Sequence, residues 1–179
     1  LWRRAGMALD AAKQHGGGAY RLFAAEMDVA MQLRRNLKQD LRAALAAGEF
    51  SVVYQPIAAL ETGALVSVEA LLRWKHPLRG SVPPAEFIPI AEEMGAIGVL
   101  GEWVLNEACA AAATWRRGIR IAVNLSPLQL KQSGLVLEIV ATLNRHGLAP
   151  SRLELEITET TLIAESAATR TALRELRAA

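Results

Sequence analysis

Beyond residue 48, short apolar segments with the character of β-strands alternate with longer segments of helical periodicity, and this alternation limits the possible folds. The strand-like segments are residues 65–74, 120–125 and 153–158. Helices are expected at residues 84–94, 97–115, 133–146 and from about 164 to the end. Such alternation is typical of α/β proteins, in which helices connect neighbouring parallel strands. The pattern therefore predicts a parallel α/β sheet or barrel.

A further strand at residues 50–57 precedes this series, and only a turn at residues 61–63 separates it from the strand at 65–74. A parallel crossover needs about a dozen or more residues, so these two strands are expected to pair antiparallel. Side chains alternate between the two faces of a strand. One face of the strand at 65–74 should carry Val66, Val68, Ala70, Leu72 and Trp74, and the other Ser67, Glu69, Leu71 and Arg73.

The composition is that of a globular protein without a strong charge bias. Of 179 residues, 52% are hydrophobic, and 20 basic against 18 acidic side chains give a formal net charge of +2. So small an excess does not favour binding to a nucleic acid polymer. Charges interrupt every apolar run before the ~18 residues of a membrane span, so this segment is expected to make no membrane contact. The single cysteine, Cys109, cannot form an internal disulfide, which favours a cytoplasmic location.

The first 47 residues have a different organisation. Residues 1–15 show helical spacing, and the three glycines at 16–18 end this helix. Residues 20–23 could form a short strand, and residues 24–47 are expected to form a longer helix with one apolar stripe. This longer helix has the character of a connector between two domains. His15, His76 and His146 lie near glycines or prolines in expected loops, without the spacing of metal ligands, and are predicted to face solvent.

Three oxygen-bearing side chains interrupt the apolar strands, namely Glu69, Asn124 and Glu156. Catalytic groups of α/β barrels cluster at the C-terminal ends of strands, and Asn124 and Glu156 lie near such ends. If the three strands are neighbours, these oxygens converge, and carboxylate and amide oxygens suit Mg²⁺ or Mn²⁺ rather than zinc. The alternative is that each glutamate faces solvent or pairs with a neighbour such as Arg73.

Five motifs occur in order along this part of the chain: YQPI (54–57), EALLRW (69–74), PAEFIPIAEE (84–93), NLS (124–126) and ELEITE (154–159). Together they resemble the successive signatures of the EAL family of cyclic di-GMP phosphodiesterases. The resemblance covers residues 48–179 and corresponds to the front half of the family's domain. It implies a TIM-like (β/α) barrel with an antiparallel first strand, cut about halfway.

The resemblance also implies a chemistry. EAL domains hydrolyse one phosphodiester of cyclic di-GMP to linear pGpG and use Mg²⁺ or Mn²⁺. By motif, Glu69 and Glu156 are the implied catalytic residues and, together with Asn124, the metal ligands. Arg73 is expected to contact a substrate phosphate and Gln55 to line the substrate pocket, while Glu159 resembles a glutamate that anchors a later loop.

The family continues with an Asp-Asp pair and a lysine beyond the last residue here, so the chain by itself is expected to be inactive. Residues 1–25 are similar to the end of a GGDEF domain, which predicts a remnant at 1–25, a connector helix at 26–47 and half an EAL domain at 48–179. A homodimer is expected for the full-length protein. The alternative function is a non-catalytic cyclic di-GMP receptor or regulatory interaction module, and the segment 24–47 could equally be a dimerisation coil.

Overall fold

The computed structural model describes residues 2–14, 18, 20–116, 118–157 and 167–178. The chain divides into two compact units, Leu1–Ala43 and Ala44–Ala179. Within the described ranges, no helix has both the length and the apolar character needed to span a membrane.

The first unit consists of helices α1 (Trp2–Gln14) and α2 (Ala25–Ala44), the second of which ends at the start of the next unit. The expected strand at residues 20–23 is wrong, because residues 20–24 are irregular. A strand is stable only beside another strand, and the described part of this unit otherwise holds helices. Phe23 instead lies under the Arg4 guanidinium, with 5.1 Å from its carbon to the ring centroid.

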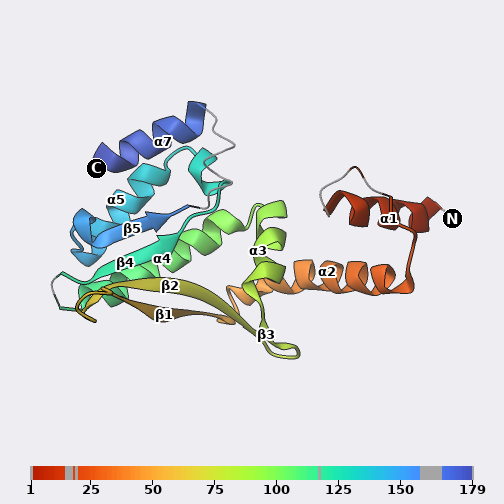
Figure 1. Ribbon diagram of the computed structural model, residues 1–179, viewed down its shortest axis with the longest axis horizontal. Coiled ribbons are helices and arrows are strands. Elements are labelled where there is room, and N and C mark those ends of the chain that lie inside the picture. Colours follow the sequence, from red (N-terminus) through yellow and green to blue (C-terminus); the bar gives the residue numbers. More distant parts are fainter. Residues whose placement is uncertain (1, 15–17, 19, 117, 158–166, 179) are drawn as a thin grey trace. The chain divides into compact units, whose positions relative to one another are not determined.

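The second unit is built on one mixed sheet (Figure 1). Its strands are β1 (Phe50–Ala58), β2 (Leu65–His76), β3 (Gly80–Val82), β4 (Arg120–Asn124) and β5 (Leu153–Glu156). The strand order is β1-β2-β4-β5, and β3 pairs with β2. β1 and β2 are antiparallel, whereas β2, β4 and β5 are parallel, which confirms the predicted mixed topology.

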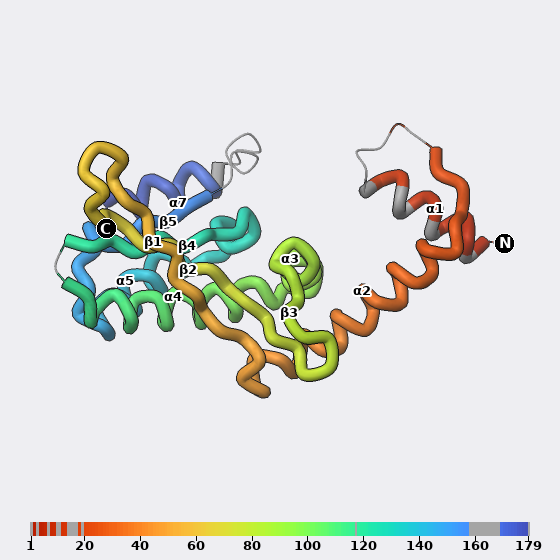
Figure 2. Tube along the Cα trace, turned by 60° about the horizontal axis from the view of Figure 1, so that its bottom comes forward, coloured from red at the N-terminus to blue at the C-terminus, as the bar shows by residue number. Residues whose placement is uncertain are grey.

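Strand β3 was not predicted, because residues 76–83 contain prolines and a glycine and were expected to form a loop. Residues 80–82 turn back to pair antiparallel with the end of β2. The Nδ1 atom of His76 accepts hydrogen bonds from the backbone N–H groups of Leu78 and Arg79, at 3.1 and 3.2 Å. His76 is 6% exposed, so the expectation that it faces solvent is wrong. The β1–β2 and β2–β3 turns lie at opposite ends of β2 (Figure 2).

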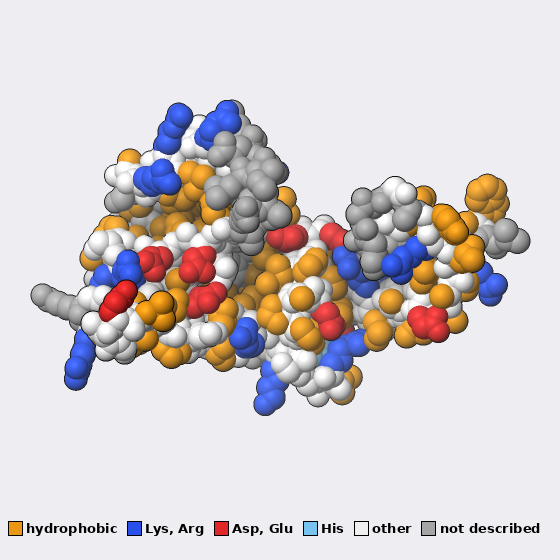
Figure 3. All heavy atoms as spheres, viewed as in Figure 1, with side chains coloured by type: hydrophobic (Ala, Val, Ile, Leu, Met, Phe, Trp, Pro, Cys, Tyr) orange, Lys and Arg blue, Asp and Glu red, His pale blue; other side chains and the backbone are white. Residues whose placement is uncertain are grey.

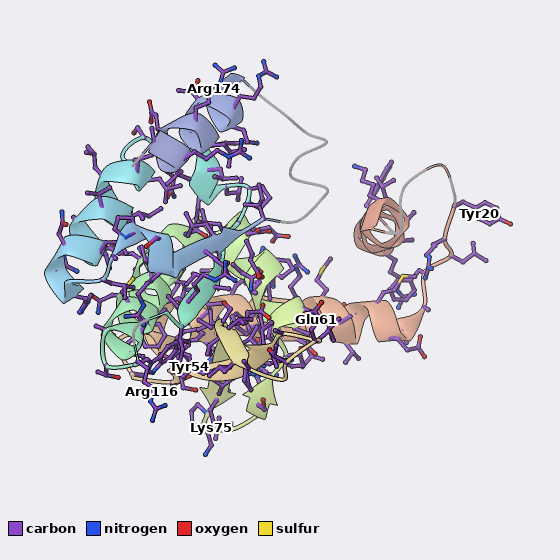
Figure 4. All side chains as sticks on the ribbon, turned by 60° about the vertical axis from the view of Figure 1, so that its left-hand side comes forward. Tyr20, Tyr54, Glu61, Lys75, Arg116 and Arg174 are labelled. Carbon is purple, nitrogen blue, oxygen red and sulfur yellow. The ribbon has the colours of Figure 1, made fainter. Side chains whose placement is uncertain are left out.

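Helices cover one face of the sheet. They are α3 (Pro84–Glu93), α4 (Ile97–Ala113), α5 (Leu135–His146) and α7 (Ala167–Ala178), with short 3₁₀ helices η1 (Gln129–Lys131) and η2 (Pro150–Arg152). The central core joins Val68, Ala70, Ile121 and Val123 of the strands to buried residues of α4 and α5. Tyr54, labelled in Figure 4, also lies on this side and donates a hydrogen bond to the Glu107 carbonyl of α4. By alternation, Glu69 of β2, Asn124 of β4 and Glu156 of β5 therefore belong to the opposite face.

Candidate active site on one face of the parallel strands

Strand register brings Glu69, Asn124 and Glu156 to one place on the sheet. Glu69 pairs with Ala122, two residues before Asn124, and Asn124 pairs with Glu156. Paired residues, and residues two apart on a strand, share a face, so all three side chains lie on the face away from the helices. Asn124 Nδ2 donates to Glu69 Oε1 at 2.7 Å, which joins two of them directly. The predicted convergence of the three side chains is therefore observed.

The backbone extends this arrangement by one residue beyond β4. The N–H group of Leu125 donates to the carbonyl oxygen of Glu156 at 2.8 Å, so the parallel ladder continues past Asn124. The three side chains are consequently held by hydrogen-bonded backbone rather than by free loops.

The site is electronegative. Acidic side chains gather over the sheet in Figure 3, and β2 and β5 supply Glu69, Glu154 and Glu156. Partial burial, and then the charges of Glu69 and Glu154, raise the pKa of Glu156 above its ordinary value. Carboxylates that repel one another in this way favour a bound cation, which relieves the repulsion.

The donor set fits a hard divalent cation. It offers two carboxylates and one amide oxygen, and the hydrogen bond from Asn124 to Glu69 uses Nδ2, not Oδ1. Oxygen ligands of this kind suit Mg²⁺ or Mn²⁺. The described residues contain no group of three or more His, Cys, Asp or Glu side chains placed to hold a metal.

The other predicted site residues lie near this cluster without joining it. Gln55 of β1 is paired opposite Glu69, and Arg73 lies four residues farther along β2 on the same face as Glu69. Arg73 Nη1 donates to the carbonyl oxygen of Leu72 at 2.9 Å. In the described part of the chain, no hydrogen bond connects Gln55 or Arg73 to the cluster. Glu159 lies outside the described residues, so its anchoring role stays a prediction.

A second polar group on the same face was missed. Ser67 Oγ donates to Glu154 Oε2 at 2.9 Å, and Arg120 Nη1 lies 2.7 Å from Glu154 Oε1. These residues lie toward the N-terminal ends of the strands, because Ser67 pairs with Arg120 two residues before Glu69. Ser67, 2% exposed, was placed on the correct face from the alternation, but its partners depend on register between strands far apart in sequence.

The loop after β4 was also missed as part of the site. Ser126 Oγ donates to Glu92 Oε1 of α3 at 2.6 Å, and the Ser126 N–H group donates to Gln129 Oε1 at 3.0 Å. The sequence contained a signal for the second contact, since Ser126 and Gln129 have the S-x-x-Q spacing of a capping box.

The EAL domain family matches residues 38–179. The chain belongs to the EAL domain family. An uncharacterized signaling protein of Caulobacter vibrioides is 51% identical over 99% of this chain and 22% of its own length. The bifunctional diguanylate cyclase/cyclic di-GMP phosphodiesterase MucR of Pseudomonas aeruginosa is 42% identical over 93% of this chain and 25% of its own length. The chain thus spans about a quarter or less of the length of these two curated relatives.

Solved structures support the same family. The MucR phosphodiesterase in complex with cyclic di-GMP has a TM-score of 0.76 and 43% identity, covering 80% of this chain and 60% of that one. The EAL enzyme Bd1971 in its cAMP-bound form has a TM-score of 0.77 and 27% identity, covering 83% of this chain and 44% of that one. These similarities confirm the EAL-type α/β fold expected from the motifs.

Proposed function

We propose that residues 44–179 form part of a metal-dependent phosphodiesterase domain that hydrolyses cyclic di-GMP to linear pGpG in second-messenger signalling. The observation that carries this proposal is the cluster of Glu69, Asn124 and Glu156 on one face of adjacent parallel strands, with Asn124 and Glu156 at the ends of β4 and β5, in a chain of the EAL family. A similar protein supports the substrate: MucR is named as a cyclic di-GMP phosphodiesterase, and its solved structure is a complex with cyclic di-GMP.

In this proposal Glu69, Asn124 and Glu156 hold Mg²⁺ or Mn²⁺. A divalent cation supplies charge neutralisation at the phosphate and a more acidic bound water. Arg73 contacts a substrate phosphate from the same strand face, as a charge-assisted donor, and Gln55 lines the pocket beside Glu69. Glu159 anchors a later loop.

Hydrolysis also depends on residues outside this segment. The aspartates of the sequence are Asp10, Asp28 and Asp40, all before residue 44, so the Asp-Asp pair that the resemblance implies is not among these residues. We therefore expect the 179-residue polypeptide alone to lack turnover, and the full-length protein to be required for the assay.

The decisive test compares Glu69→Gln with Glu61→Gln in the full-length protein. Glu61 is exposed in the β1–β2 turn, so its variant changes the same charge away from the site (Figure 4). Glu69→Gln should lower Mn²⁺-dependent pGpG formation by about 100-fold or more. This is the scale expected when a lost ligand displaces the metal and with it the reacting groups. Arg73→Ala should raise KM more than it lowers kcat. Full activity of Glu69→Gln with unchanged metal dependence contradicts the assignment.

Binding without turnover is the alternative outcome. If the full-length wild-type protein binds cyclic di-GMP in calorimetry but forms no pGpG with Mg²⁺ or Mn²⁺, the module is a receptor. In that case Arg73→Ala should weaken binding, while Glu61→Gln should not.

The similarity to MucR also motivates a proposal for the organisation of the full-length protein. We propose a GGDEF-like remnant at 1–25, a connector helix at 26–47 and part of an EAL domain at 48–179, in a cytoplasmic homodimer. The bifunctional name of MucR, which matches 93% of this chain, supports this arrangement. Light scattering of the full-length protein tests the dimer, and a monomer at micromolar concentration contradicts it.

A further inference from the structure

The loop that follows Asn124 is organised around Ser126. The Ser126 carbonyl accepts hydrogen bonds from the N–H groups of Gln129 and Leu130, at 3.0 and 3.3 Å. Its hydroxyl accepts from the N–H group of Leu128 at 3.2 Å, and its own N–H group donates to Gln129 Oε1 at 3.0 Å. This reciprocal arrangement is a capping box with Pro127 in the following position, and it fixes the first turn leading into η1.

Glu92 connects this turn to α3. The Ser126 hydroxyl donates to Glu92 Oε1 at 2.6 Å, a length typical of a charge-assisted O–H···O⁻ hydrogen bond. Both side chains are partly buried, which limits competition from water. Glu92 is 34 positions from Ser126 in the chain, so this bond is a tertiary link and not a local turn interaction.

Gln129 connects the same turn to α4. Its side chain is 6% exposed, and a Cβ atom added at Gly101 would collide with its Nε2 atom. A second glutamine repeats this contact three residues on, because a Cβ atom at Gly98 would lie 2.7 Å from Gln132 Nε2. The turn therefore rests against a glycine face of α4 while Ser126 is held by α3.

We propose that Glu92, Ser126 and Gln129 are positioning residues that hold Asn124 in the geometry required at the active site. This inference rests on the proposed function. Asn124 is two residues before Ser126, its neighbour Leu125 is bonded to Glu156, and its own amide is bonded to Glu69. The backbone that follows Asn124 is thus fixed at two successive residues, at Leu125 by β5 and at Ser126 by the Glu92-linked turn. A displacement of Ser126 is transmitted to Asn124 through only one intervening residue.

The test uses the full-length protein with Glu92→Ala, Glu92→Gln and Ser126→Ala, and with Glu86→Ala as a matched control. Glu86 lies on the same helix and is exposed. Glu92→Ala and Ser126→Ala should each lower kcat/KM by about tenfold and raise the Mn²⁺ concentration for half-maximal activity, since a charge-assisted bond that orients the site is lost. Glu92→Gln keeps an acceptor oxygen and should retain at least half of wild-type activity. Glu86→Ala should match the wild type.

The double variant identifies the contact itself. If the hydroxyl–carboxylate bond transmits the effect, Glu92→Ala combined with Ser126→Ala should be no worse than either alone. Equal loss of activity in Glu92→Gln and Glu92→Ala, or simple multiplication of the two losses, overturns the proposal.

Hydrogen exchange separates this inference from the proposed function. Peptides covering residues 124–130 should exchange faster in Glu92→Ala and Ser126→Ala than in the wild type or Glu86→Ala, whether or not the protein turns over cyclic di-GMP. Unchanged exchange in these peptides overturns the positioning role. A wild-type protein without hydrolysis or binding overturns the proposed function, while the exchange result still decides whether Glu92 holds the turn.

Discussion

Burial in the helical layer determines the chemistry of Cys109. The side chain is fully buried on α4 within the central core, and desolvation raises the pKa of its thiol from 9.0 to about 11. Because the thiolate is the reactive species, the native protein at pH 8 should hold about 100-fold less thiolate at this position than the unfolded chain. The raised pKa also contributes to the free energy of unfolding. This contribution is fully present below pH 9 and is lost as the pH rises toward 11.

Alkylation with iodoacetamide measures this directly. At pH 8 the native protein should be labelled at least about 100-fold more slowly than the urea-unfolded protein. The native thiol is less ionised, and the reagent reaches a buried side chain less easily. Cys109 is the only cysteine of the segment, so peptide mass spectrometry can follow it within the full-length protein. Labelling of native Cys109 at the unfolded rate contradicts the buried core position.

The convergence of Glu69, Asn124 and Glu156 was predictable because it needs only two local rules. Polar residues inside apolar strands are easily recognised, and side chains on the same face of neighbouring strands lie close together. The partners of Ser67, Ser126 and His76 were not predictable, since they depend on register and on loop conformation. His76 illustrates this difference. A histidine between a strand and a proline is predicted to be exposed from sequence, but in the structure its ring accepts two backbone hydrogen bonds.

At the scale of elements, the contact between η1 and α4 depends on the absence of a side chain at Gly101. This glycine lies inside a helix, where alanine has the higher intrinsic propensity by about 1 kcal/mol. Gln129 occupies the space that a Cβ atom would need, and its Oε1 atom is committed to the Ser126 N–H group. Gly101→Ala should therefore displace Gln129 and open the capping box despite the gain in propensity.

Gly101→Ala should destabilise the domain by about 1–3 kcal/mol, the usual cost of overpacking. Gly6→Ala in α1 is the matched control, because an added Cβ atom there meets nothing within 4 Å, and it should be neutral or slightly stabilising. The two variants are compared by urea denaturation of the full-length protein. Unfolding is followed by hydrogen exchange in peptides from residues 97–130. Greater stability of Gly101→Ala contradicts the packing described for Gln129.

The elements themselves were more predictable than their short connections. Long periodic segments such as α4 and the antiparallel β1–β2 pair were correctly predicted, because hydrophobic period and linker length decide them. The three-residue strand β3 and the irregular segment at residues 20–24 were predicted wrongly. Both are too short for hydrophobic periodicity to identify their conformation, so the presence or absence of a neighbouring strand decides it.

At the scale of the whole molecule, the sheet described here has a bare edge. Strand β5 pairs with β4 alone within the described residues, and α7 packs against η1 and α5 rather than along β5. Leu153, Leu155 and Ile157 are only partly buried against the core. Unpaired backbone groups beside partly exposed apolar side chains recruit other chains.

The 179-residue polypeptide, purified by itself, should therefore self-associate. Size-exclusion chromatography with light scattering at about 1–100 μM should show a mass that rises with concentration, together with a broad thermal transition. The association should persist at high salt, because pairing of strand edges and apolar contact are not screened as surface charge pairs are. The full-length protein, in which further strands of an EAL-type barrel can pair with β5, provides the control and should have a defined mass. A compact monomer of the 179-residue polypeptide with a sharp, cooperative transition is inconsistent with an open edge at β5.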